Sequence, residues 1–167
     1  LDVAVALNWG EFLPFGAYKT YDYLLATAPT LEDGLMKAAR YNGFVNDAFR
    51  PSLRRHRGQI WVDYTNCLDP QCNPPEYIEF VFACFLLRFR HTTGVAWRSL
   101  EIHFQHPPPR DLSEHHRIFQ ARVRFRQPVT RAILDPATLR IGQLLADAAT
   151  SELLEHYVRG MLNGADV

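Results

Sequence analysis

The clearest structural signal in this chain is Ala28-Pro29-Thr30-Leu31-Glu32-Asp33-Gly34-Leu35-Met36-Lys37-Ala38-Ala39-Arg40-Tyr41 (residues 28–41). Thr30 suits a helix N-cap, because its hydroxyl can accept a hydrogen bond from the N–H of Asp33, which is also the reciprocal capping partner. One apolar face then recurs at helical spacing: Leu31, Leu35, Ala38 and Ala39. Asn42-Gly43 is a good helix stop, so a helix is predicted between these signals.

On the N-terminal side, residues 1–27 are rich in aromatic and turn residues. We expect a turn-broken lead-in here, with a short helix around Tyr18–Leu25. On the C-terminal side, Arg50–Arg57 and Gln59–Thr65 flank Gly58, and this pattern predicts a β-hairpin. In the second strand Ile60, Val62 and Tyr64 share one face, while Trp61 and Asp63 share the other.

The middle of the chain predicts a loop and then a buried helix. Asn66–Pro75 contains three prolines and two cysteines, which is typical of a loop. Glu76–Thr93 is apolar nearly all round and is followed by Gly94, so we expect a central core helix.

The remaining segments predict strands and helices in mixed order. Ser99–Gln105 alternates as a half-buried strand, with Leu100, Ile102 and Phe104 inward. Leu112–Gln120 is expected to be a short helix with Asp111 and Glu114 as its capping pair, and Arg122–Arg126 and Arg131–Leu134 are expected to be strands. A last helix is predicted from Thr150 to Leu162. Together these elements predict an α+β fold in which an antiparallel sheet packs on a buried central helix, as a single domain over residues 1–167.

Composition excludes several functional classes. The 167 residues are 47% hydrophobic and 22% charged with a net charge of zero, which argues against direct binding to nucleic acid. No run of about 20 apolar residues predicts a membrane span, and residues 1–167 are not expected to include a signal peptide. The three cysteines, Cys67, Cys72 and Cys84, form no disulfide framework, so a cytoplasmic location is expected.

The order of the segments resembles a known regulatory domain. The Pro29-Thr30-Leu31 helix ends in Ala39-Arg40-Tyr41, and the apolar helix ends at Gly94 with Trp97 shortly after it. The later motifs are Phe104-x-His106-x-Pro108, the short helix ending in Phe119, and Leu134-Asp135-Pro136-Ala137-Thr138-Leu139. Over residues 5–160 this pattern is similar to the N-terminal arabinose-binding-type domain of AraC/XylS-type transcription regulators. The short helix departs from the pattern, because Gln120 stands where a glycine is usual.

The resemblance implies a bacterial effector-sensing and dimerisation domain that controls an attached C-terminal DNA-binding domain. The expected partners are an unidentified small-molecule effector and a second copy of the chain. We expect DNA to be bound only through a helix-turn-helix domain absent from residues 1–167, because no recognition-helix pattern or basic surplus occurs here.

The aromatic residues are the best candidates for an effector pocket between the sheet and the core helix. An arginine could hold a carboxylate effector there, and a completely filled core is the alternative. The candidate ligand-binding residues are Trp61, Tyr64, Arg88, Trp97, Phe104, Phe119 and Arg124.

Other chemistry has little support in the sequence, and we predict no catalytic residue, metal site or cofactor. His103, His106, His115 and His116 are interpreted as surface or capping histidines, because no carboxylate or cysteine stands at a metal-binding spacing with them. Cys67 and Cys72 lack the second pair that a structural zinc site needs. The chain is therefore expected not to be an enzyme. An alternative is a standalone carrier of haem or another apolar small molecule, with His103 or His106 as an axial ligand.

The apolar stripe of the last helix allows two interpretations, which stay open. Its members, Leu153, Leu154, Tyr157, Val158, Met161 and Leu162, could seal the domain or could form a dimerisation or linker surface.

Overall fold

The structure is a computed structural model that describes residues 3–67 and 74–164. Its helices are α1 (Val3–Phe12), α2 (Thr20–Ala26), α3 (Leu31–Tyr41), α4 (Pro75–Thr93), α5 (Ser113–Phe119) and α6 (Ala148–Gly164). Its strands are β1 (Phe49–His56), β2 (Gln59–Asn66), β3 (Glu101–His103), β4 (Arg122–Arg124) and β5 (Thr130–Leu134). Two short 3-10 helices, η1 (Asn42–Phe44) and η3 (Thr138–Arg140), complete a single α+β domain.

The strands form one five-stranded sheet in the order β1-β2-β5-β3-β4. The pairs β1–β2, β2–β5 and β5–β3 are antiparallel, as predicted, but β3 and β4 are parallel. The antiparallel prediction is wrong for this last pair because α5 lies between the two strands and carries the chain back, so that β4 runs in the same direction as β3.

The predicted hairpin is confirmed, and its turn explains its register. Arg57 and Gly58 both have positive φ, 48° and 74°, as in the two-residue turns whose twist matches that of a hairpin. His56 consequently pairs with Gln59, and Ile60, Val62 and Tyr64 are buried on the core side as predicted. Trp61 lies on the opposite face of the sheet, where the Arg131 guanidinium stands 3.7 Å from its ring centroid.

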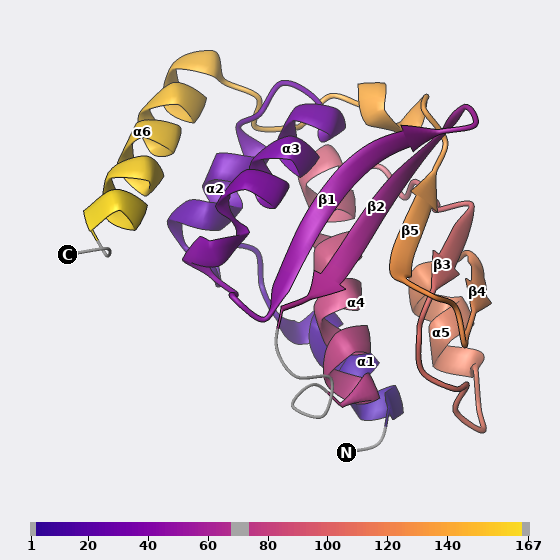
Figure 1. The fold of residues 1–167 in the computed structure, drawn as a ribbon. Helices are drawn as coiled ribbons and strands as arrows, with labels where there is room; N and C mark the ends of the chain where they lie inside the picture. The colour runs from indigo at the N-terminus through magenta and orange to yellow at the C-terminus, as the bar shows by residue number, and fades with distance from the viewer. Residues whose placement is uncertain (1–2, 68–73, 165–167) are drawn as a thin grey trace.

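Helix α4 lies behind the sheet, and α1 packs against it (Figure 1). The predicted turn-broken lead-in is wrong for residues 3–12, which form α1. Gly10 looked like a breaker, but it is a contact point, because a Cβ at this position would lie 3.2 Å from the Cβ of Ala83 on α4. The missing side chain is what lets the two helices approach so closely.

Arg90 of α4 finds its hydrogen-bond partners inside the fold. Arg90 donates from Nε to the carbonyl of Trp97 (2.9 Å) and from its two terminal nitrogens to the carbonyls of Ile118 (2.7 Å) and Phe119 (2.8 Å). The last two carbonyls belong to the end of α5, where helix carbonyls lack partners of their own. One guanidinium thus joins the end of α4 to the end of α5.

Helix α3 begins as the sequence predicts. The Thr30 hydroxyl donates to the Asp33 carboxylate (2.6 Å), and the Thr30 oxygen accepts from the Asp33 N–H (3.3 Å). Leu31, Leu35 and Ala38 are buried. This helix stands beside α2 and β1, so its cap is part of the framework of the domain.

The last helix, α6, is joined to α3 by a polar cluster centred on Glu155. The Glu155 carboxylate accepts from Lys37 (2.8 Å), the Tyr41 hydroxyl (2.6 Å) and Arg159 (2.8 Å). The predicted stripe is divided: Val158 is buried, whereas Leu153, Tyr157 and Met161 are at least half exposed. The buried part of the stripe seals the domain, and the exposed part remains available for contact with another surface.

Several smaller predictions need correction. The strand predicted over 99–105 is only three residues long, and Leu100, expected inward, is exposed, because the backbone becomes regular only at Glu101. The departure at Gln120 leaves the turn intact, because Gln120 takes the left-handed conformation (φ 49°) that favours glycine. The Cys67–Cys72 pair lies partly outside the described residues. Within the described part of the chain, no helix is both long and apolar enough to span a membrane.

A first prediction concerns the cap of α3. Thr30→Ala leaves the N–H of Asp33 without its side-chain acceptor and should lower the free energy of unfolding by about 1 kcal/mol. Urea unfolding followed by circular dichroism measures the loss. Thr30→Ser keeps the hydroxyl and should recover most of it; equal losses in the two variants would show that the cap is not the cause.

A second prediction concerns Glu155. Hydrogen bonds from Lys37 first, and then from Tyr41, lower the pKa of Glu155 to about 2 from the ordinary value of 4.5. Because the folded state has the lower pKa, this contribution is complete above about pH 4.5 and is lost as the pH falls towards 2. Glu155→Gln should therefore cost about 1–2 kcal/mol at pH 6 and almost nothing near pH 2. A difference that does not change with pH would contradict this assignment.

Candidate functional site

A partly enclosed cavity of about 130 Å³ lies between α2, α4 and β2, beside the segment that follows α3. Its lining is mainly aromatic, with a few polar groups among the rings. The side chains around it include Tyr18, Tyr21, Asn42, Tyr64, Phe80, Cys84, Phe85, Arg88 and Phe89. An apolar enclosure with few polar groups is the usual form of a small-molecule site.

Among the described residues, Arg88 is the only charged one that lines this cavity, and most of its guanidinium is already occupied. Its Nε donates to Asp22 Oδ1 (2.6 Å), and its Nη2 reaches Asp22 Oδ2 at 3.3 Å. Its guanidinium carbon stands 4.2 Å from the ring centroid of Tyr18. The remaining nitrogen, Nη1, is buried and has no hydrogen-bond partner among the described residues. Arg88 therefore has one nitrogen, with two N–H groups, that no described residue satisfies.

Asp22 is held as firmly as Arg88. It is fully buried at the start of α2, and its Oδ2 accepts from the backbone N–H groups of Gly16 (2.8 Å) and Tyr18 (3.0 Å). These donors share the negative charge with the guanidinium. Arg88 and Asp22 therefore form a rigid ion pair beside the cavity, and the pair has no net charge.

The other polar groups of the cavity are neutral at physiological pH. Burial raises the pKa of Tyr64 well above its usual value of 10, and burial also raises the pKa of the Cys84 thiol to about 11. Tyr64 thus keeps its hydroxyl proton, and Cys84 stays a thiol without the reactivity of a thiolate. The cavity therefore offers hydrogen-bond donors rather than a nucleophile.

The size of the cavity limits what it can hold. Apolar cavities of about 150 Å³ in proteins accept a molecule as large as benzene. At about 130 Å³ this cavity suits a ligand of that size or slightly smaller. A haem is far too large for it.

A second buried polar group lies on the other side of α4. Glu79 is fully buried, and its Oε1 stands 3.0 Å from Nε2 of His115 and 3.3 Å from Nε2 of His106. The interpretation of these two histidines as surface or capping residues is wrong, because the carboxylate of α4 draws both rings into the core. His103 instead faces Glu101 (2.8 Å) on β3, so neither His103 nor His106 lines the cavity. Among residues 3–67 and 74–164, no group of three or more acidic, cysteine or histidine side chains is arranged to hold a metal ion.

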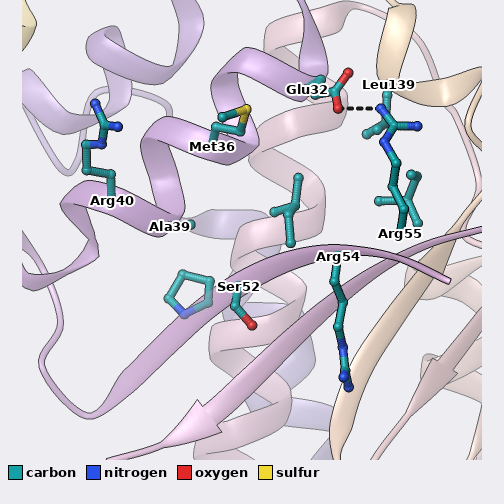
Figure 2. Close-up of a pocket in the computed structure, with 11 residues that line it drawn as sticks. Glu32, Met36, Ala39, Arg40, Ser52, Arg54, Arg55 and Leu139 are labelled. Carbon is teal, nitrogen blue, oxygen red and sulfur yellow. Dashed lines mark hydrogen bonds and ion pairs between the residues drawn. The ribbon is translucent and has the colours of Figure 1, made fainter.

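An open groove of about 520 Å³ lies between α3 and β1 (Figure 2). Met36 and Ala39 come from α3, Leu53 from β1 and Ile60 from β2. Arginines stand along it, and an ion pair between Arg55 and Glu32 (2.7 Å) spans one part of it. The groove shares no lining residue with the enclosed cavity.

The structure brings together two of the seven candidate residues, Tyr64 and Arg88, at the enclosed cavity. Phe104 and Phe119 are fully buried in a packed aromatic core around Phe82, with ring centroids 5.7 and 6.3 Å from its own. The remaining three candidates lie away from the cavity. Trp61 is on the outer face of the sheet, Trp97 lies beyond the end of α4, and Arg124 donates to Glu101 (2.9 Å).

The sequence did not point to Tyr18 and Tyr21, which line the cavity, or to Asp22, which binds Arg88. A signal existed: an acidic residue in the first turn of a short helix whose neighbours are aromatic. The partner of Asp22 is 66 residues away, however, and only the packing of α2 on α4 reveals it. Glu79 was passed over in the same way, as one polar residue on an apolar helix.

Comparison with solved structures supports the fold. The transcriptional regulator CdpR from Pseudomonas aeruginosa is similar to this chain, with a TM-score of 0.78 and 16% sequence identity. The match covers 92% of this chain and 50% of that protein, so the chain spans half the length of that regulator. At this level of identity the likeness concerns the fold alone. No curated protein matches the sequence.

The family is shown by a sequence model. Residues 1–141 match the model of the N-terminal arabinose-binding domain of AraC transcription regulators. The matched region holds the cavity, α4 and the whole sheet, and α6 follows it. Because the model covers well over half of the chain, this protein belongs to the family of N-terminal arabinose-binding domains of AraC transcription regulators.

Proposed function

We propose that this domain senses a small molecule in the enclosed cavity and passes the binding event to an attached C-terminal DNA-binding domain. The observation that carries the proposal is the free Nη1 of Arg88 beside an aromatic cavity. A buried donor without a partner is costly, and a bound acceptor would remove that cost. The family membership supports a regulatory role and a role without catalysis.

The cavity indicates the chemistry of the effector. Its rings favour a flat or compact apolar body, and Arg88 and Tyr64 favour a hydrogen-bond acceptor such as a carbonyl or carboxyl oxygen. The Asp22–Arg88 pair is already neutral, so only the Nη1 nitrogen of the guanidinium is offered and a multiply charged anion is disfavoured. We therefore expect a small aromatic or short-chain molecule with one acceptor group.

The packing of the cavity suggests how binding is transmitted. Asn42 lines the cavity and directly follows Tyr41, whose hydroxyl donates to Glu155 on α6 (2.6 Å). Helix α2, which carries Tyr21, also contacts α6. A ligand that prefers one position of α2 and of residue 42 would bias the position of α6, and with it any domain that follows.

The same proposal includes assembly and location. Leu153, Tyr157 and Met161 expose an apolar stripe on α6 that a second copy could cover to form a homodimer. We expect the regulator to work in the bacterial cytoplasm and to contact DNA only through the C-terminal domain.

The effector is tested by thermal shift on this chain. Benzoate-sized acids, small aromatic carbonyl compounds and short-chain fatty acids are compared with pentoses and dicarboxylates. A ligand that binds only the folded state should raise the melting temperature. At a concentration a hundred times its Kd, it should stabilise the folded state by about 2.7 kcal/mol. A response to the sugars alone would contradict the cavity as the site, because their hydroxyls find few acceptors there.

Variants connect such a response to the cavity. Tyr64→Phe removes one donor and should weaken the affinity about tenfold, and Cys84→Met should fill the space and abolish binding. Tyr157→Phe removes a hydroxyl from exposed α6 and is the matched control, which should bind as the parent does. Unchanged affinity in Tyr64→Phe and Cys84→Met together would place the ligand elsewhere.

The dimer is tested separately. Leu153→Glu combined with Met161→Glu puts charges into the exposed stripe and should raise the dimer dissociation constant at least tenfold in sedimentation velocity. Glu152→Gln is a neighbouring exposed substitution that should have no effect. A parent chain that stays monomeric at high concentration would contradict dimerisation through α6.

A further inference from the structure

The outer edge of β1 pairs with no other strand among the described residues. This strand forms one edge of the sheet and pairs only with β2. In an antiparallel pair, alternate residues direct their N–H and C=O groups away from the partner. Because the hairpin turn places His56 opposite Gln59 as a bonded pair, Leu53 and Arg55 are among the residues that direct both groups outward.

Two local details agree with this assignment of inward-facing and outward-facing residues on β1. Pro51, which has no N–H, lies two residues from Leu53 and loses nothing at an outward-facing position. The Phe49 carbonyl accepts from the Asn42 side chain, which stands outside the sheet. Within the described residues, no backbone group bonds to the outward groups of Leu53 or Arg55.

The groove of Figure 2 runs beside this edge. Leu53 and Ile60 line it on the sheet side, and Met36 and Ala39 line it on the side of α3. An extended segment added to the edge would bond to Leu53 and Arg55 and would place alternate side chains over these apolar residues. The volume of about 520 Å³ suits a short segment of this kind.

The charge along the edge selects the occupant. Arg40 and Arg55 line the groove, while the Arg54 side chain points to the opposite face of the sheet, where it pairs with Asp63. Arg50 and Arg57 lie near the two ends of the same strand. The facing carboxylates are shared: Asp63 also binds Arg131, and Glu155 also binds Lys37 and Arg159. A surplus of arginine thus collects here on a chain whose net charge is zero.

This surplus argues against a second copy of the chain as the occupant. Two β1 edges paired with each other would bring arginine against arginine, which destabilises a strand pair. An acidic segment would instead find cations on both sides of its backbone. The exposed Arg55–Glu32 pair, with relative side-chain exposures of 66% and 35%, would yield easily to such a segment.

We propose that β1 and α3 form a docking site for an extended acidic segment of a partner protein, which adds to the sheet as a sixth strand. The site is separate from the effector cavity. It provides an attachment point on the regulatory domain that does not depend on DNA or on the effector.

The probe is a fluorescein-labelled hexapeptide that alternates glutamate and valine, with an alternating lysine and valine peptide as its counterpart. Fluorescence anisotropy with the 167-residue chain should show binding of the acidic peptide only. In ¹⁵N-edited spectra the amides of Leu53 and Arg55 should become protected from exchange on binding. Two further acidic peptides carry N-methyl groups on alternate residues, one on the odd positions and one on the even positions. They should differ in affinity, because only one of the two sets of amides would face β1 and bond to it.

Variants distinguish the groove from general charge attraction. Arg40→Gln with Arg55→Gln should weaken binding about tenfold. Arg110→Gln with Arg122→Gln removes the same charge from exposed positions elsewhere and should leave binding unchanged.

Several results would overturn the proposal. They are equal weakening in the two double variants, equal binding of the two N-methylated peptides, and no binding up to millimolar peptide. In the last case the arginines would serve only to prevent pairing between edges. Each of these results leaves the thermal-shift response of the effector cavity unaffected, so the two proposals can fail independently.

Discussion

Helix α4 is buried on nearly every side, so each charged group on it must find its partner within the fold. Three of these groups do so in three directions. Arg88 reaches Asp22 on α2, Arg90 reaches the carbonyls at the end of α5, and Glu79 reaches two histidines of the segment around α5. A buried charge without a partner would cost several kcal/mol, so these contacts limit how the surrounding elements can be arranged. The apolar surface of α4 drives its burial, while its charges determine the orientation of its neighbours.

The core is divided by this helix into a filled part and a hollow part. Around Phe82, Phe104 and Phe119 the rings interlock without a large void, which is the packing that gives a domain its stability. Around Tyr64 and Arg88 the packing is incomplete, and polar groups stand in the gap. One part of the aromatic cluster is therefore a packed core, and another part of the same cluster lines a cavity.

Local rules predicted the elements well. Thr30 with Asp33, Gly58 in the hairpin turn and Gly94 after α4 mark boundaries that depend on the backbone of a few neighbouring residues, and the structure agrees with each. Family resemblance, carried by the order of these elements, extended the prediction to the class of domain. Single-residue rules failed where a neighbour in space reverses them, as at Gly10, which permits a helix contact instead of ending a helix.

The site was harder to predict because its contacts are distant in sequence. Alternation along β2 correctly placed Tyr64 inward, but nothing local shows that Arg88 faces Asp22 or that His115 faces Glu79. The parallel pairing of β4 has the same origin, since strand direction depends on the path of the chain through α5. Trp61 and Arg124 were chosen as candidates for their chemistry, but neither of them lines the cavity.

The attachment of α6 has a consequence for motion. This helix meets the rest of the domain through Val158 and a few apolar neighbours and through the cluster at Glu155, whereas α4 is enclosed by the sheet and α1. Its free energy of local opening must therefore be much smaller than that of the whole domain. Amide hydrogens of α6 would exchange with solvent through excursions in which the core stays folded. We therefore expect α6 to open as a separate cooperative unit and to rebind many times within the lifetime of one folded molecule.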